Sequence, residues 1–326
     1  MQLYPLKFKP ILKDKIWGGQ KLKTYLNKEF LHLPNCGESW EISGVANDIS
    51  IVENGNLAGN SLQELIEVYM GDLIGDKVYE KFGQEFPLLI KFIDASNVLS
   101  IQVHPDDAAA KERHNAFGKT EMWYIIQADK GSELISGFNR KTDKQTYLEH
   151  LRDKKLKDIL NYEKVSEGDV FFIPSGRVHA IGAGILLAEI QQTSDITYRI
   201  YDWDRVDANG QGRELHTNLA VDVIDYKHYE SYRTNYDKIK NTEINLASCQ
   251  YFTTKLLEFD TDIRKDYNLI DSFIIFMCLS GEFDIVYGDN EECRVTKGET
   301  VLLPAEINDI VLKPVENAKL LEVFIG

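Results

Sequence analysis

One short pattern occurs twice in this chain and constrains its fold more than any other feature. Residues 168–174 read Gly-Asp-Val-Phe-Phe-Ile-Pro, and residues 298–304 read Gly-Glu-Thr-Val-Leu-Leu-Pro. Each copy has a glycine and an acidic residue that suit a turn, four residues typical of a strand, and a proline that ends it. Two related β-units in one chain would produce such a repeat, although chance is a competing explanation for so short a pattern.

The remaining sequence favours a mainly β chain with a few inserted α-helices. Ser61 and Thr142 begin capping-box patterns that predict helices, and a third helix is expected after Pro105. From about residue 245 onward the pattern is almost purely β, and 326 residues are enough for two hydrophobic cores. We expect strands at residues 86–93, 98–103, 122–127, 170–173, 185–191 and 197–201.

Composition limits the partners of the chain. A net charge of −15 argues against nucleic acid or an anionic membrane as a partner, because both need a basic face. A phosphorylated substrate would therefore need a local basic pocket. The four cysteines are scattered, which indicates free thiols in a reducing compartment. Since the sequence has no signal-like N-terminus and no long apolar run, we expect a cytoplasmic protein, of an oligomeric state that the sequence leaves open.

Polar side chains alternate along the predicted strand at 98–103 and just beyond it. Ser100, Gln102 and His104 are spaced two residues apart, so all three project from one face of a strand. Burying such groups without partners would cost roughly a few kcal/mol each, which a bound cation and a substrate would offset. For His104 taken alone, a hydrogen-bonded core histidine is the more common outcome.

Two further residues complete a candidate metal site. Glu121 opens the next predicted strand, and residues 168–179 end in His179 with the form Gly-x5-Pro-x-Gly-x2-His, which resembles the second metal-binding motif of cupins. Ala183 stands where that motif usually has an asparagine. The combined set has two imidazoles and two oxygen donors and suits one zinc ion with an open position: Gln102, His104, Glu121 and His179.

Four segments, in order, resemble the signatures of type I phosphomannose isomerases, and the resemblance extends over nearly the whole chain. They are residues 100–106 (Ser-Ile-Gln-Val-His-Pro-Asp), 119–124 (Lys-Thr-Glu-Met-Trp-Tyr), 176–181 (Gly-Arg-Val-His-Ala-Ile) and 197–203 (Thr-Tyr-Arg-Ile-Tyr-Asp-Trp). The resemblance implies two cupin-like (jelly-roll) β-barrels: a catalytic metal-binding domain with helical insertions at 1–240, and a C-terminal cupin-like domain without a metal site at 241–326.

The same resemblance implies an activity and a ligand set. The chain is expected to be a zinc-dependent aldose-ketose isomerase with one Zn²⁺ per chain. It would interconvert mannose 6-phosphate and fructose 6-phosphate by proton transfer through a cis-enediol. Its zinc ligands would be Gln102, His104, Glu121 and His179.

Cationic and hydroxyl side chains near these motifs are expected to hold the substrate. The resemblance makes Arg199 the active-site arginine and Ser100 a phosphate contact. From the residues alone, an ion pair of Arg199 with Asp202 or Asp195 is at least as common. Arg205 is a weaker phosphate candidate, because it is only a second cation near the same motif.

The general base is left open. Lys119 lies two residues before Glu121, so strand alternation would put both on the inner face, and the resemblance makes Lys119 an active-site residue. Glu189, on the predicted strand at 185–191, resembles a pocket glutamate of the family. Lys119, Glu189 and a zinc-bound water are all candidates for the base.

Two other functions would use related side chains. A cupin oxygenase would place similar ligands around iron, and a sugar-sensing protein would keep the site without turnover; the glutamine ligand and Arg199 argue against them. Asp309 stands where the first copy of the repeat has His179, so we expect the C-terminal unit to support the fold or close the pocket without a metal. The remaining histidines receive no functional role: His32, His114, His150, His216 and His228.

Overall fold

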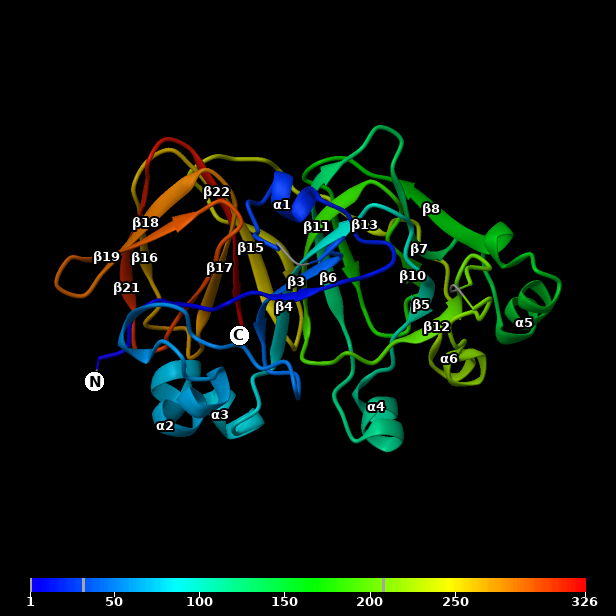
Figure 1. Cartoon of the computed structure of the whole chain (residues 1–326), viewed down its shortest axis with the longest axis horizontal. Helices are drawn as coiled ribbons and strands as arrows, with labels where there is room; N and C mark the ends of the chain where they lie inside the picture. Colours follow the sequence, from blue (N-terminus) through cyan, green and yellow to red (C-terminus); the bar gives the residue numbers. More distant parts are fainter. Residues whose placement is uncertain (1, 31–32, 207–208) are drawn as a thin grey trace.

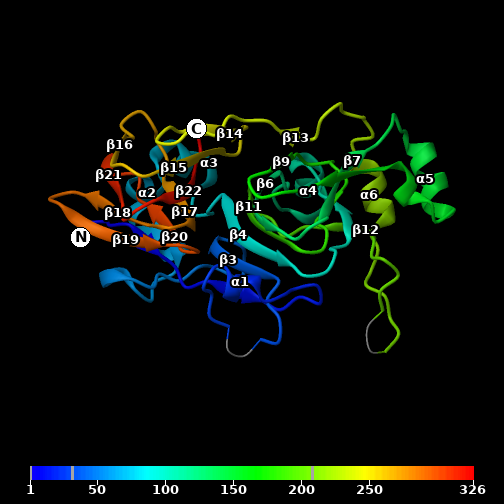
Figure 2. The ribbon, with the colours of Figure 1, turned by 90° about the horizontal axis from the view of Figure 1, so that it is seen from above.

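The computed structural model describes residues 2–30, 33–206 and 209–326, so His32 lies outside the described residues. The chain is mainly β, as predicted, with a few helices. Figures 1 and 2 show two β-rich halves side by side along the long axis of the molecule, with the helices around them.

The N-terminal half contains two antiparallel sheets. Their strands are β2 (Ile11–Lys13), β3 (Glu38–Ser43), β4 (Leu88–Ala95), β5 (Ile101–Val103), β6 (Glu121–Ala128), β7 (Glu133–Phe138), β8 (Leu160–Lys164), β9 (Val170–Ile173), β10 (His179–Ala180), β11 (Ile185–Gln192), β12 (Tyr198–Tyr201) and β13 (Arg233–Thr234). One sheet has seven strands in the order β13-β9-β6-β11-β4-β3-β2, and the other has five in the order β12-β5-β10-β7-β8. Each of the six predicted strands is present, with ends shifted by a few residues at most.

The C-terminal half repeats this arrangement with sheets of fewer strands. Its strands are β14 (Ile244–Ser248), β15 (Thr253–Phe259), β16 (Ile263–Asp266), β17 (Ile274–Ser280), β18 (Glu282–Tyr287), β19 (Glu291–Thr296), β20 (Thr300–Leu303), β21 (Asp309–Pro314) and β22 (Ala318–Phe324), joined by β1 (Leu6–Lys7) from the N-terminus. The six-stranded sheet has the order β1-β20-β17-β22-β15-β14, and the four-stranded sheet has the order β16-β21-β18-β19. Leu6 pairs with Leu302, so the start of the chain completes a sheet of its end.

The strand orders support the sequence repeat. The order β9-β6-β11-β4-β3 of the first half recurs as β20-β17-β22-β15-β14 in the second, and β5-β10-β7-β8 recurs as β16-β21-β18-β19. The two copies of the repeated pattern contain β9 and β20, which hold the same place in these orders.

The mainly β class is confirmed, whereas the two cupin-like (jelly-roll) β-barrels stay a prediction. Among the described residues, none of the four sheets closes on itself, and each ends in two edge strands. Both a barrel and a pair of facing sheets need short strands with one inward and one outward face, so the sequence pattern could not separate them.

The most extensive hydrophobic core lies between the two halves. In β11, Leu186 and Ala188 belong to this core together with Leu321 of β22, whereas Leu187 belongs to a separate core inside the N-terminal half. Every residue of β11 is buried because both faces of the strand are covered. The predicted domain boundary near residue 240 stays a prediction, since the two halves share this core.

All three predicted helices are present, two of them predicted from capping boxes and the third from its start after Pro105. Ser61 caps α2 (Leu62–Ile74) with both capping-box bonds, and Asp106 caps α4 (Asp107–His114). Helix α5 (Lys144–Arg152) is capped by Asp143 and not by Thr142, because the Asp143 carboxylate accepts from the Thr146 amide at 2.7 Å. The other helical segments are α1 (Lys21–Thr24), α3 (Asp76–Phe82), α6 (Thr217–Val223) and the 3-10 turns Gly55–Leu57 and Leu156–Ile159. Over the described ranges, no helix has both the length and the apolar character that crossing a membrane requires.

Candidate metal centre

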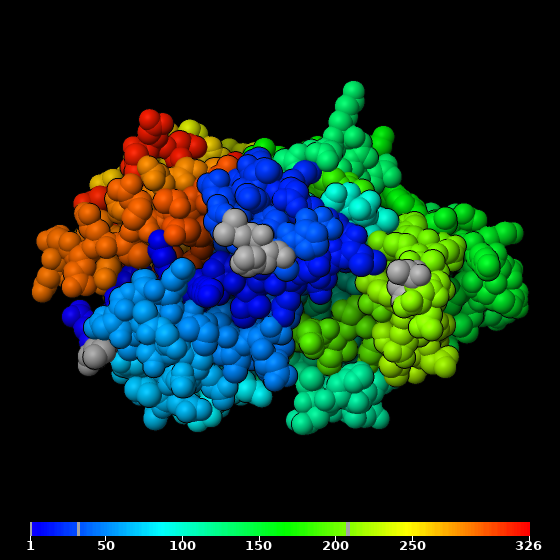
Figure 3. Space-filling model, viewed as in Figure 1, coloured from blue at the N-terminus to red at the C-terminus, as the bar shows by residue number. Residues whose placement is uncertain are grey.

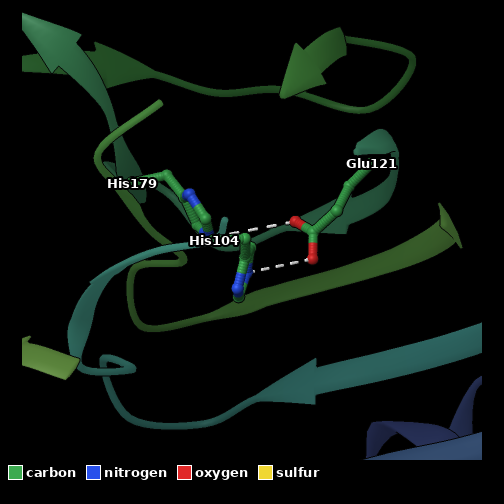
Figure 4. Close-up of side chains that lie close together, drawn as sticks. All are labelled: His104, Glu121 and His179. Carbon is green, nitrogen blue, oxygen red and sulfur yellow. Dashed lines mark ion pairs between the residues drawn. The ribbon is translucent and has the colours of Figure 1, made fainter. Parts of the chain in front are cut away.

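The four predicted ligands meet in the space between the two sheets of the N-terminal half. Gln102 on β5 and His179 on β10 are register partners in the five-stranded sheet, and His104 follows β5 by one residue. Glu121 opens β6 in the facing seven-stranded sheet. Figure 4 shows the side chains of His104, Glu121 and His179 pointing toward one another from these separate elements.

The ligand atoms of this cluster are close together and sealed from solvent. His104 Nε2 lies 3.2 Å from Glu121 Oε1, and His179 Nε2 lies 3.8 Å from Glu121 Oε2. The Gln102 amide nitrogen lies 3.3 Å from His179 Nε2. One ligand atom from each of His104, Glu121 and His179 falls within a 4.8 Å span, close to the roughly 3 to 4 Å separations around one zinc ion. His104, Glu121 and His179 are each at most 1% exposed.

Backbone contacts fix which nitrogen of each imidazole is free. His104 Nδ1 lies 2.8 Å from the carbonyl of Ile196, and His179 Nδ1 lies 2.8 Å from the carbonyl of Arg177. A carbonyl can only accept, so both Nδ1 atoms carry the proton and both Nε2 lone pairs face the cluster. His104 Nε2 and both Glu121 oxygens are buried without an aligned hydrogen bond. A cation bound by these atoms would satisfy them.

The electrostatics keep the cluster in the form that binds a cation. Burial, followed by the nearby Lys119, lowers the pKa of His104 to about 3, and burial also lowers the pKa of His179. Burial alone would raise the pKa of Glu121, but Lys119 and His104 lower it well below its usual range. Two neutral imidazoles and a carboxylate are the protonation states that a divalent metal requires.

Lys119 and Glu189 lie beside the cluster, together with a residue that the sequence reasoning missed. Lys119 Nζ lies 3.0 Å from Glu121 Oε1. Glu189 accepts hydrogen bonds from Lys91 Nζ at 3.0 Å and from Trp123 Nε1 at 2.8 Å. Burial and the charge of Glu121 raise the pKa of Glu189, while Lys91 opposes them. Lys91 was missed because it lies within the apolar run of β4. Its place near the cluster follows only from the pairing of β4 with β11, which sets Lys91 beside Glu189.

The predicted arginines gather at the edge of the five-stranded sheet. Arg199 on β12 pairs with Gln102 on β5, and its guanidinium donates to the carbonyl of Glu214 at 2.8 Å. Asp202, the alternative partner of Arg199, is taken by two other arginines: Arg205 donates to it, and Arg213 donates to both of its oxygens at 2.6 and 2.7 Å. Sequence reasoning missed Arg213, since only the folding of the loop after β12 brings it back to Asp202.

Ser100 and His216 complete the surroundings. Ser100 is 4% exposed, and its hydroxyl lies 3.5 Å from the Gln102 amide oxygen, on the inner face as predicted. His216, which received no role from the sequence, accepts from the Arg199 amide at 3.1 Å and returns a backbone bond to the Arg199 carbonyl at 2.7 Å. The histidine therefore fixes the backbone that carries this arginine.

The C-terminal half has a different interior at the corresponding positions. Strand register defines these corresponding positions. In the first half, Glu189 pairs with Trp123, and Trp123 pairs with Phe171 of the repeat. In the second half, Glu322 pairs with Phe276, and Phe276 pairs with Val301 of the repeat. Glu322 is thus the counterpart of Glu189. By the same register, the counterpart of Glu121 is Ile274, and the counterpart of Lys91 is Lys255.

Lysine neutralises this second buried carboxylate. Lys265, 3% exposed, donates to Glu322, which is fully buried, and to Glu243 at 2.6 Å. Tyr267 donates to the same Glu322 oxygen at 3.1 Å. Asp309 is more than half exposed and lies 3.6 Å from Arg264, outside this interior. Among the described residues, the one group of His, Cys, Asp and Glu side chains close enough to hold a metal ion is His104, Glu121 and His179. A C-terminal half without a metal site stays a prediction.

Known proteins resemble this chain in sequence and in structure. Residues 5–160 match the family model for the phosphomannose isomerase type I catalytic domain. The chain is 36% identical over 319 residues to mannose-6-phosphate isomerase ManA of Bacillus subtilis, covering 96% of this chain and 97% of the relative. It is 35% identical over 307 residues to mannose-6-phosphate isomerase of Streptococcus mutans, covering 93% of each. The crystal structure of mannose 6-phosphate isomerase from Bacillus subtilis superimposes with a TM-score of 0.87 and 32% identity, over 98% of this chain and 99% of that one.

Proposed function

Because the chain belongs to the type I phosphomannose isomerase family, we propose that it is a zinc-dependent aldose-ketose isomerase acting on mannose 6-phosphate and fructose 6-phosphate. The observation that carries the proposal is the buried group of His104, Glu121 and His179. His104 Nε2 and the Glu121 oxygens lack an aligned hydrogen bond, with Lys119 as the one ion-pair partner of Glu121 besides the histidines among the described residues, and a bound cation would satisfy these atoms together.

One zinc ion per chain would be held by Gln102, His104, Glu121 and His179. The two imidazoles already present Nε2 to the centre. Gln102 has its amide nitrogen toward His179, and a flip of its terminal amide would present the oxygen instead. When bound, the zinc ion supplies an electrophile that polarises a sugar oxygen. The donor set also accepts other divalent ions, so metal analysis forms part of the test.

The arginines at the edge of the five-stranded sheet are proposed to bind the phosphate of the substrate. Ser100, Arg199 and Arg205 are the predicted contacts, and Arg213 adds a third guanidinium next to Asp202. The charges of Arg213 and Arg205 act on Arg199, whose pKa is lowered by burial and by these two neighbours. Three guanidinium groups lie near the carboxylates of Asp202 and Glu214, which leaves a local excess of positive charge that a phosphate needs in an acidic protein.

Glu189 is the proposed proton carrier. It would take the C2 proton of mannose 6-phosphate while the C1–C2 bond becomes double and Lys119 gives a proton to the aldehyde oxygen, which yields the cis-enediol. Return of the carried proton to C1, while the O2 proton passes to Lys119 and the C2–O2 bond becomes double, gives fructose 6-phosphate. A pKa raised by burial suits a carboxylate that must both accept and return a proton, and Lys119 would donate to the substrate oxygen that gains charge.

The test is an assay of the purified protein with mannose 6-phosphate under anaerobic conditions. We expect turnover that stops after chelation and returns when zinc is added. A cupin oxygenase would need oxygen, and a sugar sensor would bind the substrate without converting it. Either of those outcomes would refute the isomerase.

The finer description of the fold is also a proposal. We take the two pairs of sheets to be cupin-like jelly rolls, in line with the recurring strand order. The division at residue 240 would separate a metal-binding unit from a metal-free one, with β1 contributed to the second unit by the N-terminus.

A further inference from the structure

The segment that carries Lys119 and Glu121 is held from behind by one side chain. Between them, the backbone amide of Thr120 donates to Gln192 Oε1 at 2.9 Å. The backbone amide of Gln192 donates to the Thr120 carbonyl at 3.2 Å. Both Thr120 and Gln192 are 4% exposed. The side-chain amide of Gln192 therefore extends the β6–β11 pairing to the residue that separates Lys119 from Glu121.

Asp107 holds Gln192 in turn. Asp107 Oδ1 accepts from Gln192 Nε2 at 2.9 Å and from the Gly118 amide at 2.9 Å. A Cβ on Gly118 would lie 2.6 Å from the backbone of Asp106 and Asp107, so the segment rests directly on the start of α4. The Asp107 carboxylate thus fixes the segment 118–120 at both of its ends.

The chain of hydrogen bonds ends in the C-terminal half. Tyr251, in the turn between β14 and β15, donates its hydroxyl to Asp107 Oδ2 at 2.6 Å. Burial and this bond raise the pKa of Tyr251, and the bonds from Tyr251 and Gln192 lower the pKa of Asp107 against its burial, so the hydroxyl stays the donor. Asp107, Gln192 and Tyr251 border a cavity of about 1100 Å³. Figure 3 shows the corresponding hollow between the α2–α3 region and α4.

We infer that Tyr251, Asp107 and Gln192 are positioning residues that hold Lys119 and Glu121 in register with the two histidines. The inference rests on the proposed function for its catalytic consequence. It gives the C-terminal half a role in the chemistry: Tyr251 reaches the opposite half and sets the place of a ligand and of a catalytic lysine. A displacement of about 1 Å at such groups can cost about a hundredfold in rate.

Two variants test the inference, with a matched control. Tyr251→Phe removes only the hydroxyl, and Gln192→Met removes the two side-chain bonds, to the Thr120 amide and to Asp107, at similar size. Tyr236→Phe is the control, because Tyr236 also donates one hydroxyl bond, to the Gly168 carbonyl, away from the segment 118–120. Three readouts apply: zinc affinity by competition with a chelator, amide hydrogen exchange at Gly118 and Thr120, and kcat and KM for mannose 6-phosphate.

We expect Gln192→Met to weaken zinc binding by about 10- to 100-fold and Tyr251→Phe to weaken it less, by up to about 10-fold. Both should speed exchange at Gly118 and Thr120 and lower kcat more than they change KM, whereas Tyr236→Phe should change none of these. If Tyr251→Phe and Gln192→Met match Tyr236→Phe in zinc affinity and amide exchange, the positioning role is wrong. If the isomerase proposal is wrong, the wild-type protein will show no turnover. Zinc affinity and amide exchange would still decide the positioning role in that case.

Discussion

The N-terminal and C-terminal halves each bury a glutamate at the same register position, Glu189 and Glu322, but surround it differently. A lysine donates to each glutamate, Lys91 to Glu189 and Lys265 to Glu322, but the C-terminal half has Ile274 at the position of Glu121. In the N-terminal half the neighbouring Glu121 has two oxygens without aligned hydrogen bonds, and two imidazoles face them. The comparison teaches that the shared strand order does not make a metal site; a few side chains within it do.

The largest effect should come from removing a ligand on the N-terminal side. His179→Ala deletes one imidazole, so we expect zinc content to fall to near zero after dialysis and isomerase activity to fall by at least about 10²- to 10³-fold. Metal analysis and the activity assay measure both. His228→Ala, at an exposed histidine, is the control and should keep one equivalent of zinc. A His179→Ala protein that retained one equivalent of zinc would contradict the proposed metal site in the N-terminal half.

The C-terminal half should respond in stability and not in metal content. Lys265→Met leaves Glu322 buried without its cation, which should lower the free energy of unfolding by about 3–5 kcal/mol in urea titrations. The double variant Lys265→Met/Glu322→Leu should recover most of that loss, because the whole ion pair is replaced by apolar groups. Zinc content should equal that of the wild type in both, and a loss of zinc would show that the two interiors are not independent.

The halves should also lose stability in different pH windows once metal is removed. Because the pKa of His104 is lowered to about 3, the unfolded chain binds more protons than the native chain below the ordinary histidine pKa of about 6.5. Its contribution is complete above that pH and falls as the pH decreases, by up to about 1.4 kcal/mol per pH unit. Burial would raise the pKa of Glu243, but Lys255 and Lys265 lower it, so its contribution falls only below about pH 4.3.

Urea unfolding of the metal-free protein between pH 4.5 and pH 8 measures this difference. We expect His104→Gln to flatten the dependence between about pH 4.5 and 6.5, while Glu243→Gln leaves that range as it is. Equal slopes for the wild type and His104→Gln would mean that His104 is not held neutral by its burial.

The smallest effect should come from restoring the missing histidine of the second repeat. Asp309→His places a histidine at the position that His179 has in the first copy, but residue 309 is more than half exposed and lies beside Arg264. We expect no second equivalent of zinc and a change in unfolding free energy within about 0.5 kcal/mol. A second bound zinc ion would show that the repeat, and not the local interior, carries the metal site.

The sequence allowed prediction where local rules act. Ser61 was predicted as a cap because its side chain bonds an amide three residues away, the helix after Pro105 was predicted from its start, and His104 and His179 lie in compact motifs. Thr142 was wrong by one residue because the adjacent Asp143 caps equally well. These cases depend on a few neighbouring residues, and their errors are correspondingly small.

Prediction failed where distant strands decide the contacts. Lys91 meets Glu189 across a sheet, and Arg213 meets Asp202 through a loop closure, so neither contact has a local signature. Tyr251 reaches Asp107 across the two halves of the molecule. Whether sheets close into a barrel or stay open is likewise not a local property, because edge pairing depends on twist and strand length and not on the alternation that the sequence displays.

The pairing of β1 with β20 has a consequence for how the chain is made. The Leu3 amide donates to Glu306, 303 positions away, in the same region where β1 pairs with β20. On the ribosome, β1 is synthesised long before β20, so its partner strand is missing while the intervening residues are made. During that time β1 is an unpaired strand with uncovered apolar side chains, so holding chaperones should bind it and chains terminated before β20 should self-associate.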